Sequence, residues 1–226
     1  MRRKTHSRAD RGADAYFTPP VGILSLLHLE EGKIPQVVLE PACGDGAIVL
    51  PMRAAGFRVI ACDLMERRCP DMTAGLDFLA ADGITSAPAI VTNPPYGIGT
   101  KFMRRCVEIA PYVAALLPIN FLAGINRRPW HETSPLARVW VASRRLPMMH
   151  REGWDGPKAS SSMDTGWFIW SREHRGAPAI RFYDWLEICG DGPMACDASA
   201  TRDRAHQIGG SDELVDVEAD LVVTTG

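Results

Sequence analysis

The stretch VVLEPACGDGAIVL, residues 37–50, joins two hydrophobic patterns of different period and decides the class of fold. The apolar, β-branched run at 37–39 is typical of a short buried strand. Apolar residues at helical spacing follow in AIVLPMRAAG, residues 47–56. Between the two, Gly44 and Gly46 allow the backbone to pass close to a ligand at the start of the helix. The stretch therefore predicts a strand, a candidate ligand-binding loop and a helix.

The same alternation continues on both sides of this unit. Further strands are predicted at 57–62, 89–92 and 112–117, a short one leads into 76–78, and helices are predicted at 21–29 and 99–110. Strands that alternate with helices at this spacing predict an α/β fold with a doubly wound, mostly parallel, Rossmann-like sheet. Three later strands are predicted at 138–143, 166–171 and 179–185. Because no helix pattern separates the last two, we expect a hairpin that closes the sheet edge.

The length and composition fit one large domain with two appendages. The chain has 226 residues, of which 46% are hydrophobic and 23% charged, and residues 15–190 carry the periodic patterns. Residues 1–14 are predicted to be a flexible basic arm, and 191–226 an acidic, largely disordered tail. No apolar run is long enough for a membrane span, and no apolar segment follows the basic N-terminus. We therefore expect a cytoplasmic protein.

Cysteine and histidine usage gives no metal-binding pattern. The six cysteines include no C-x-x-C pair, and the six histidines are scattered. We expect reduced thiols and no metal.

The net charge of −2 hides an uneven distribution. Residues 191–226 hold eight acidic residues against two arginines, which leaves 23 basic and 19 acidic residues, a charge of +4, in the rest. Residues 101–158 include ten basic residues but only four acidic ones. This bias fits a phosphate-binding face, and it also fits a solvated helix surface. The candidates for nucleic-acid contact are Lys101, Arg127, Arg128, Arg144, Arg145 and Trp154.

The glycine loop indicates a particular kind of ligand. It lacks the third glycine of the dinucleotide fingerprint and the Gly-Lys-Ser/Thr of a P-loop, which favours a nucleotide-like ligand without a pyrophosphate. Asp63 ends the next strand, where an acid can accept hydrogen bonds from ribose hydroxyls or cap a helix. Asp77 and Phe78 could receive an adenine, through its amino group and its ring face, although a core phenylalanine is an alternative.

Residues 91–97, VTNPPYG, require a stiff loop at the end of a strand. The amino group of an adenine is a poor nucleophile, because its lone pair is delocalised into the ring. If the Asn93 side-chain oxygen and the Pro94 carbonyl each accept one amino hydrogen, the lone pair is freed, and Pro94 and Pro95 hold these acceptors in place. Tyr96 would stack on a base flipped out of its helix. The alternative is a simple tight turn.

With these motifs, the chain resembles the class I, S-adenosylmethionine (AdoMet)-dependent amino-methyltransferases, and among them the DNA adenine-N6 methyltransferases. The matches follow the family's γ-type order: TPP at 18–20, EPACGDG at 40–46, Asp63, DF at 77–78 and NPPY at 93–96. LLPINFLAG, residues 116–124, is a plausible continuation. The resemblance implies a seven-stranded sheet with a reversed final strand, AdoMet as cofactor and DNA as partner.

The resemblance also implies roles for individual residues. Asn93, Pro94, Pro95 and Tyr96 would form the catalytic pocket for the flipped base. The methionine portion of AdoMet would contact Thr18 and the glycine loop. The ribose of AdoMet would contact Asp63, and its adenine would contact Asp77 and Phe78. The residues implied to bind the cofactor are Thr18, Pro19, Glu40, Pro41, Ala42, Cys43, Gly44, Gly46, Asp63, Asp77, Phe78 and Asn93.

The chain departs from restriction-type members because it lacks a large target-recognition domain. Residues 119–165 and the basic arm remain for substrate recognition, a layout similar to that of compact orphan methyltransferases of phages and mobile elements. An RNA adenine or guanine amino group is an alternative target, as is a protein glutamine. A catalytically inactive nucleic-acid binder on the same scaffold is a further alternative.

Overall fold

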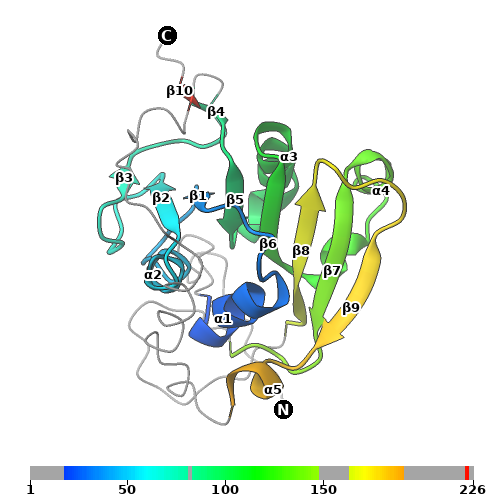
Figure 1. Cartoon of the computed structure of the whole chain (residues 1–226). Helices are drawn as coiled ribbons and strands as arrows, with labels where there is room; N and C mark the ends of the chain where they lie inside the picture. Colours follow the sequence, from blue (N-terminus) through cyan, green and yellow to red (C-terminus); the bar gives the residue numbers. More distant parts are fainter. Residues whose placement is uncertain (1–17, 81–82, 148–162, 191–221, 224–226) are drawn as a thin grey trace, which may run out of the picture.

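The structure, a computed structural model, describes residues 18–80, 83–147, 163–190 and 222–223. Within these ranges a central sheet has eight strands (Figure 1). Their order across the sheet is β3 (Thr73–Ala74), β2 (Arg58–Asp63), β1 (Val37–Glu40), β5 (Ala89–Thr92), β6 (Tyr112–Pro118), β8 (Thr165–Ser171), β7 (Leu136–Ala142) and β9 (Ala179–Tyr183). A separate short pair joins β4 (Ile84–Ser86) to β10 (Val222–Val223).

Strand direction confirms the predicted α/β class. The strands β3, β2, β1, β5 and β6 pair in parallel, so their carboxyl ends meet at one edge of the sheet. The reversed strand β8 lies between β6 and β7 and pairs antiparallel with both. Open sheets of this kind bind ligands at the carboxyl ends of their parallel strands.

The edge of the sheet differs from the prediction. The expected hairpin between 166–171 and 179–185 is wrong, because β9 passes β8 and pairs in parallel with the outer side of β7. This pairing adds an eighth strand to the seven that the resemblance implies. The predicted strand also ends early, because Asp184 accepts a hydrogen bond from the Leu186 amide (2.9 Å) and caps a short helix.

Helices cover both faces of the sheet. One apolar cluster gathers α1 (Pro20–Leu29), α2 (Val49–Ala54) and α5 (Trp185–Cys189) on one face. A second cluster gathers α3 (Gly99–Ile109) and α4 (Arg128–Thr133) on the other. Strand alternation supplies both clusters, as in β8, where Trp167 and Phe168 are fully buried on opposite faces. No described helix is long and apolar enough to cross a membrane.

A buried carboxylate ties α1 to the sheet. Glu30 is 0% exposed at the end of α1, and it accepts hydrogen bonds from Arg138 Nε (2.7 Å), Trp140 Nε1 (2.7 Å) and the Tyr112 hydroxyl (3.2 Å). Burial by itself would raise the pKa of Glu30, but the hydrogen bonds from Arg138 and Trp140 and the charge of Arg138 lower it below its ordinary value. Glu30 is therefore ionised in the folded protein at neutral pH.

The stretch proposed for substrate recognition, 119–165, contains part of the sheet itself. It includes a 3₁₀ turn, η3 (Ile119–Leu122), the helix α4 and the strand β7. Residues 148–162, with the candidate Trp154, lie outside the described residues, as do the predicted arm and nearly all of the predicted tail.

Candidate functional site

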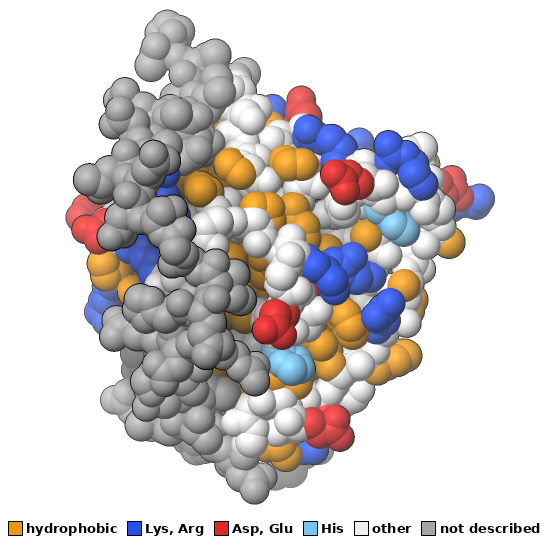
Figure 2. All heavy atoms as spheres, viewed as in Figure 1, with side chains coloured by type: hydrophobic (Ala, Val, Ile, Leu, Met, Phe, Trp, Pro, Cys, Tyr) orange, Lys and Arg blue, Asp and Glu red, His pale blue; other side chains and the backbone are white. Residues whose placement is uncertain are grey.

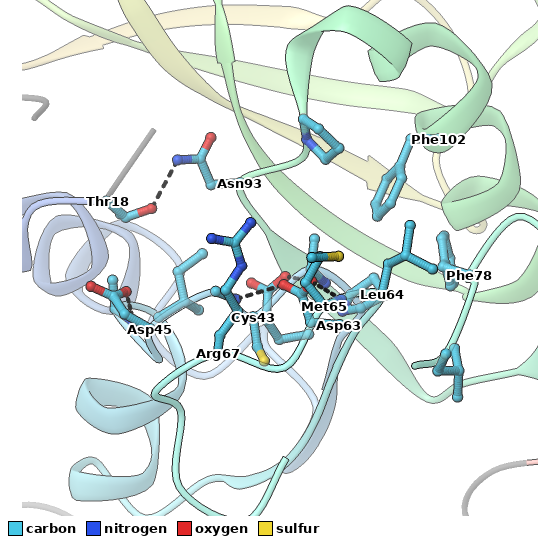
Figure 3. A pocket seen from close by; sticks show the side chains of 18 of the residues that line it. Thr18, Cys43, Asp45, Asp63, Leu64, Met65, Arg67, Phe78, Asn93 and Phe102 are labelled. Carbon is cyan, nitrogen blue, oxygen red and sulfur yellow. Dashed lines mark hydrogen bonds between the residues drawn. The ribbon is translucent and has the colours of Figure 1, made fainter. Parts of the chain in front are cut away.

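A cavity of about 310 Å³ opens at the carboxyl ends of β1, β2 and β5 (Figure 3). This volume lies at the lower end of the range for small-molecule sites, roughly 300–1,000 Å³. The predicted site residues that line it are Thr18, Glu40, Pro41, Ala42, Cys43, Gly44, Asp63, Asp77, Phe78, Asn93 and Pro95. Four predicted residues, Pro19, Gly46, Pro94 and Tyr96, are not among the lining residues. Tyr96 is half-buried and packs against the cluster around α3.

Asp63 joins the loops that follow β1 and β2. Its two carboxylate oxygens accept the backbone amides of Gly44 (2.9 Å) and Met65 (2.9 Å). Gly44 has a φ of +55°, and a Cβ there would meet no atom within 4 Å. A carboxylate offers about four lone-pair directions, so Asp63 retains capacity for hydroxyl groups of a ligand.

Glu40 forms a buried part of the cavity wall beside Asp63. It is 1% exposed, and its Oε1 accepts the Ala42 amide (3.1 Å). Burial raises the pKa of Glu40 to about 8, although the hydrogen bond from the Ala42 amide opposes this shift. Glu40 is therefore largely protonated at neutral pH.

The raised pKa of Glu40 predicts a pH-dependent stability. The folded chain holds a proton that the unfolded chain releases near pH 4.5, so the free energy of unfolding falls as pH rises from 4.5 to about 8. We expect Glu40→Gln to remove this decline in the free energy of unfolding, on the order of 5 kcal/mol, in urea unfolding across that pH range. The exposed Glu132→Gln is the matched control and should follow the wild type. If the free energy of unfolding depended on pH in the same way in Glu40→Gln and in the wild type, Glu40 would be ionised in the folded protein at neutral pH.

One end of the cavity is apolar. Phe78 is 3% exposed and packs at a tilt on Phe102, with ring centroids 4.7 Å apart. Three exposed apolar side chains, Leu64, Met65 and Ile98, also line the cavity. Large apolar side chains left exposed around a slot are typical of a ligand site. The sequence prediction missed these neighbours of Phe78, although Leu64 and Met65 directly follow Asp63 in the chain.

Asn93 is held at the opposite wall. Its side-chain amide nitrogen donates a hydrogen bond to the Thr18 hydroxyl (3.1 Å), which joins two motifs that lie 75 residues apart. Figure 3 shows the amide oxygen of Asn93 pointing away from Thr18. Pro95 is extended, with φ −62° and ψ 116°, and leads into the 3₁₀ turn η2 (Tyr96–Ile98). The hydrogen bond to Thr18 therefore sets the orientation of the Asn93 amide.

Arg67 is a cavity residue that the sequence prediction missed. It lies on the loop after β2, its Nε is fully buried, and its guanidinium extends into the cavity towards Asn93 and Thr18 (Figure 3). It forms no hydrogen bond or ion pair with any residue that the structure describes. No sequence signal marks it, because it stands in the polar run Glu66-Arg67-Arg68.

The basic candidates for nucleic-acid contact are mostly engaged within the protein. Arg144 pairs with Asp184 (2.9 Å), Arg145 with Asp164 (2.7 Å) and Arg128 with Glu132 (2.7 Å). On the face in Figure 2, basic side chains are interspersed with acidic ones rather than gathered in one patch.

Two further basic candidates differ in their surroundings. Arg127 donates to the carbonyls of Asn120 and Phe121 (both 3.1 Å), which closes its own loop. Lys101 is exposed on the first turn of α3, close to η2 in the chain.

A second hollow of about 830 Å³ lies beside α4 and is more open than the first. Its walls come from the loop before α4, from α4 itself and from the turn before β9. It contains none of the glycine-loop, Asp63 or Asn93 groups, so the cavity at the strand ends is the candidate site. Within the described residues, no three His, Cys, Asp or Glu side chains gather closely enough to hold a metal ion.

The sequence matches no protein-family model and no curated protein significantly. Solved structures do match. A class I AdoMet-dependent methyltransferase of Listeria monocytogenes, provisionally assigned as such, aligns with a TM-score of 0.54 and 12% identity over 85% of this chain and 70% of its own. A provisionally assigned RNA methyltransferase of Pyrococcus horikoshii aligns with a TM-score of 0.52 and 16% identity over 70% of this chain and 88% of its own.

The methyltransferase subunit of a type I restriction-modification system from Streptococcus thermophilus aligns with a TM-score of 0.53 and 13% identity. The match covers 76% of this chain and 47% of the subunit, so the chain spans about half the length of that relative. At these identities the likeness concerns the fold. The fold of this chain is that of the class I AdoMet-dependent methyltransferases.

Proposed function

We propose that the protein transfers a methyl group from AdoMet to the exocyclic amino group of adenine in DNA. The observation that carries this proposal is the position of Asn93. Its amide stands in an Asn-Pro-Pro-Tyr loop at the end of β5, is oriented by Thr18, and lines the same cavity as Asp63 and the glycine loop.

The cavity fits AdoMet in the chemistry of its walls. The apolar slot around Phe78 and Phe102 suits an adenine ring, and Asp77 at its edge suits the adenine amino group. Asp63 suits ribose hydroxyls, and the glycine loop with Thr18 suits the methionine portion. AdoMet would supply the electrophilic methyl group on its sulfonium.

The chain's own residues prepare the amino group. The Asn93 oxygen and the Pro94 carbonyl accept its two hydrogens, which draws the nitrogen towards tetrahedral geometry and frees its lone pair. Pro94 and Pro95 limit the motion of both acceptors, so little reorganisation is needed at the moment of transfer. Tyr96, half-buried at the end of this loop, contacts the flipped base with its accessible part. The proton that the methylated amino group loses leaves to solvent.

Two arguments favour DNA as the polymer. The order of motifs and the Asn-Pro-Pro-Tyr loop resemble those of DNA adenine-N6 methyltransferases, and a matched structure is a restriction-modification methyltransferase subunit. The positive charge of residues 1–190 suits a polyanion. RNA is the second candidate, favoured by the match that covers 88% of an assigned RNA methyltransferase.

The test is to identify the methylated product. The full chain is incubated with labelled AdoMet and, separately, with duplex DNA, single-stranded DNA and total RNA, and each polymer is digested to nucleosides for mass spectrometry. We expect N6-methyladenine from DNA, and a strongly reduced amount of it from an Asn93→Ala variant in the same incubation time. Label only in RNA nucleosides would transfer the proposal to RNA. Label in no nucleic acid would direct the search to protein glutamine.

A further inference from the structure

We propose that Arg67 binds the carboxylate of the methionine portion of AdoMet. This inference rests on the proposed function, because it assigns one contact within the proposed cofactor site. Arg67 belongs to none of the motifs that suggested the site. The argument starts from the surroundings of its guanidinium.

The Nε of Arg67 favours an anionic partner. An arginine side chain keeps its positive charge in proteins, and a buried donor without a partner is costly. Arg67 as a whole is half-buried, but its Nε is fully buried, and the side chain forms no hydrogen bond or ion pair with any described residue. A bound anionic group would satisfy this charge.

The acidic residues of the cavity are occupied in other ways. Both oxygens of Asp63 accept backbone amides, and one oxygen each of Asp45 and Asp77 accepts the amide two residues further on. Glu40 is largely protonated at neutral pH. None of the four forms an ion pair with Arg67 in the structure, so its guanidinium remains available to a ligand.

The position of Arg67 selects which part of the ligand it meets. Figure 3 shows Phe78 and Phe102 at one end of the cavity, Asp63 between, and the Arg67 guanidinium directed towards Thr18 and Asn93. A ligand with its base in the apolar slot and its ribose at Asp63 brings its amino-acid portion to Arg67. The carboxylate is the anionic group of AdoMet, and a planar guanidinium can bind it through two parallel hydrogen bonds.

The experiment compares two ligands that differ in this group. S-adenosylhomocysteine carries the amino-acid portion, whereas 5′-methylthioadenosine lacks it. Both are titrated calorimetrically into the wild type, Arg67→Ala and Arg67→Lys, with Arg128→Ala as a charge-matched control beside the second hollow. We expect Arg67→Ala to lower the affinity for S-adenosylhomocysteine by about 10- to 100-fold. The affinity for methylthioadenosine should stay within about two-fold of the wild-type value. Arg67→Lys should fall between, and Arg128→Ala should match the wild type.

Other results would overturn the assignment. An equal loss of affinity for both ligands in Arg67→Ala would mean that Arg67 is a general part of the cavity wall. No loss of affinity for either ligand would mean that Arg67 does not bind the cofactor. If only DNA binding and its salt dependence were reduced, Arg67 would instead contact a substrate phosphate. A wild type that binds neither adenosine ligand would refute the cofactor site itself. A wild type that shows the expected ligand discrimination without methylating nucleic acid would support Arg67 and refute the substrate.

Discussion

Replacing Asn93 by alanine is expected to lower kcat by about 10²- to 10³-fold, as the loss of one preorganised polar partner typically does. The reason is that the Asn93 oxygen accepts a hydrogen of the target amino group in the proposed mechanism. The measurement is single-turnover methylation of DNA, with AdoMet binding determined in parallel. AdoMet affinity should stay within a few-fold of the wild type, because Asn93 is one of many residues that line the cavity.

Three further variants separate the oxygen of Asn93 from its hydrogen bond to Thr18. Asn93→Asp keeps an acceptor oxygen at the same distance from the backbone and should retain part of the activity. Asn93→Gln moves the acceptor by one methylene and should be nearly as slow as alanine. Thr18→Val removes the 3.1 Å hydrogen bond to Asn93 but keeps the Asn93 oxygen, so at saturating AdoMet it should reduce the rate of methyl transfer less than Asn93→Ala does. Near-normal turnover by Asn93→Ala would contradict the proposed mechanism.

Replacing Arg138 by alanine is expected to lower the free energy of unfolding by about 3–5 kcal/mol. The substitution leaves the Glu30 carboxylate, which is 0% exposed, without its charged partner. Urea unfolding at neutral pH measures the effect. The wild-type contribution of Glu30 should fade as the pH falls below 4.5, because the folded state has the lower pKa and the unfolded chain takes up the proton first.

A double variant and an exposed ion pair provide the controls. Glu30→Gln combined with Arg138→Met removes both charges and should be less destabilising than Arg138→Ala alone. Arg128→Ala breaks an exposed pair with Glu132 at the same N–O distance of 2.7 Å and should cost less than about 1 kcal/mol. Equal losses in Arg138→Ala and Arg128→Ala would mean that burial of Glu30 has no energetic consequence.

The central elements of the fold could be predicted because their signals are local. The run at 37–39, the glycine loop and the helix pattern after it became β1 and α2, and the same period rules located β5, α3 and β6. The site followed from these elements, because carboxyl ends of parallel strands meet at one edge. Asp63 and Gly44, 19 residues apart, are thus joined by a hydrogen bond.

The partners of the arginines could not be predicted from the local sequence. Ten basic residues within 101–158 suggested a phosphate-binding face, but charge along a chain does not reveal which acid lies opposite in space. The structure pairs Arg144 with Asp184, 40 residues away, and Arg145 with Asp164. Arg67, outside that stretch, faces the cavity instead.

By itself, the sequence determined the strand and helix units, the class of fold and half of the residues around the cavity, because hydrophobic period, glycine and proline act within a few residues. Only the tertiary structure decided that β9 adds in parallel to β7, that Glu30 pairs with Arg138 across 108 residues, and that Arg67 enters the cavity. These outcomes depend on which distant surfaces pack together and which charges then lose access to water. No local pattern encodes that information.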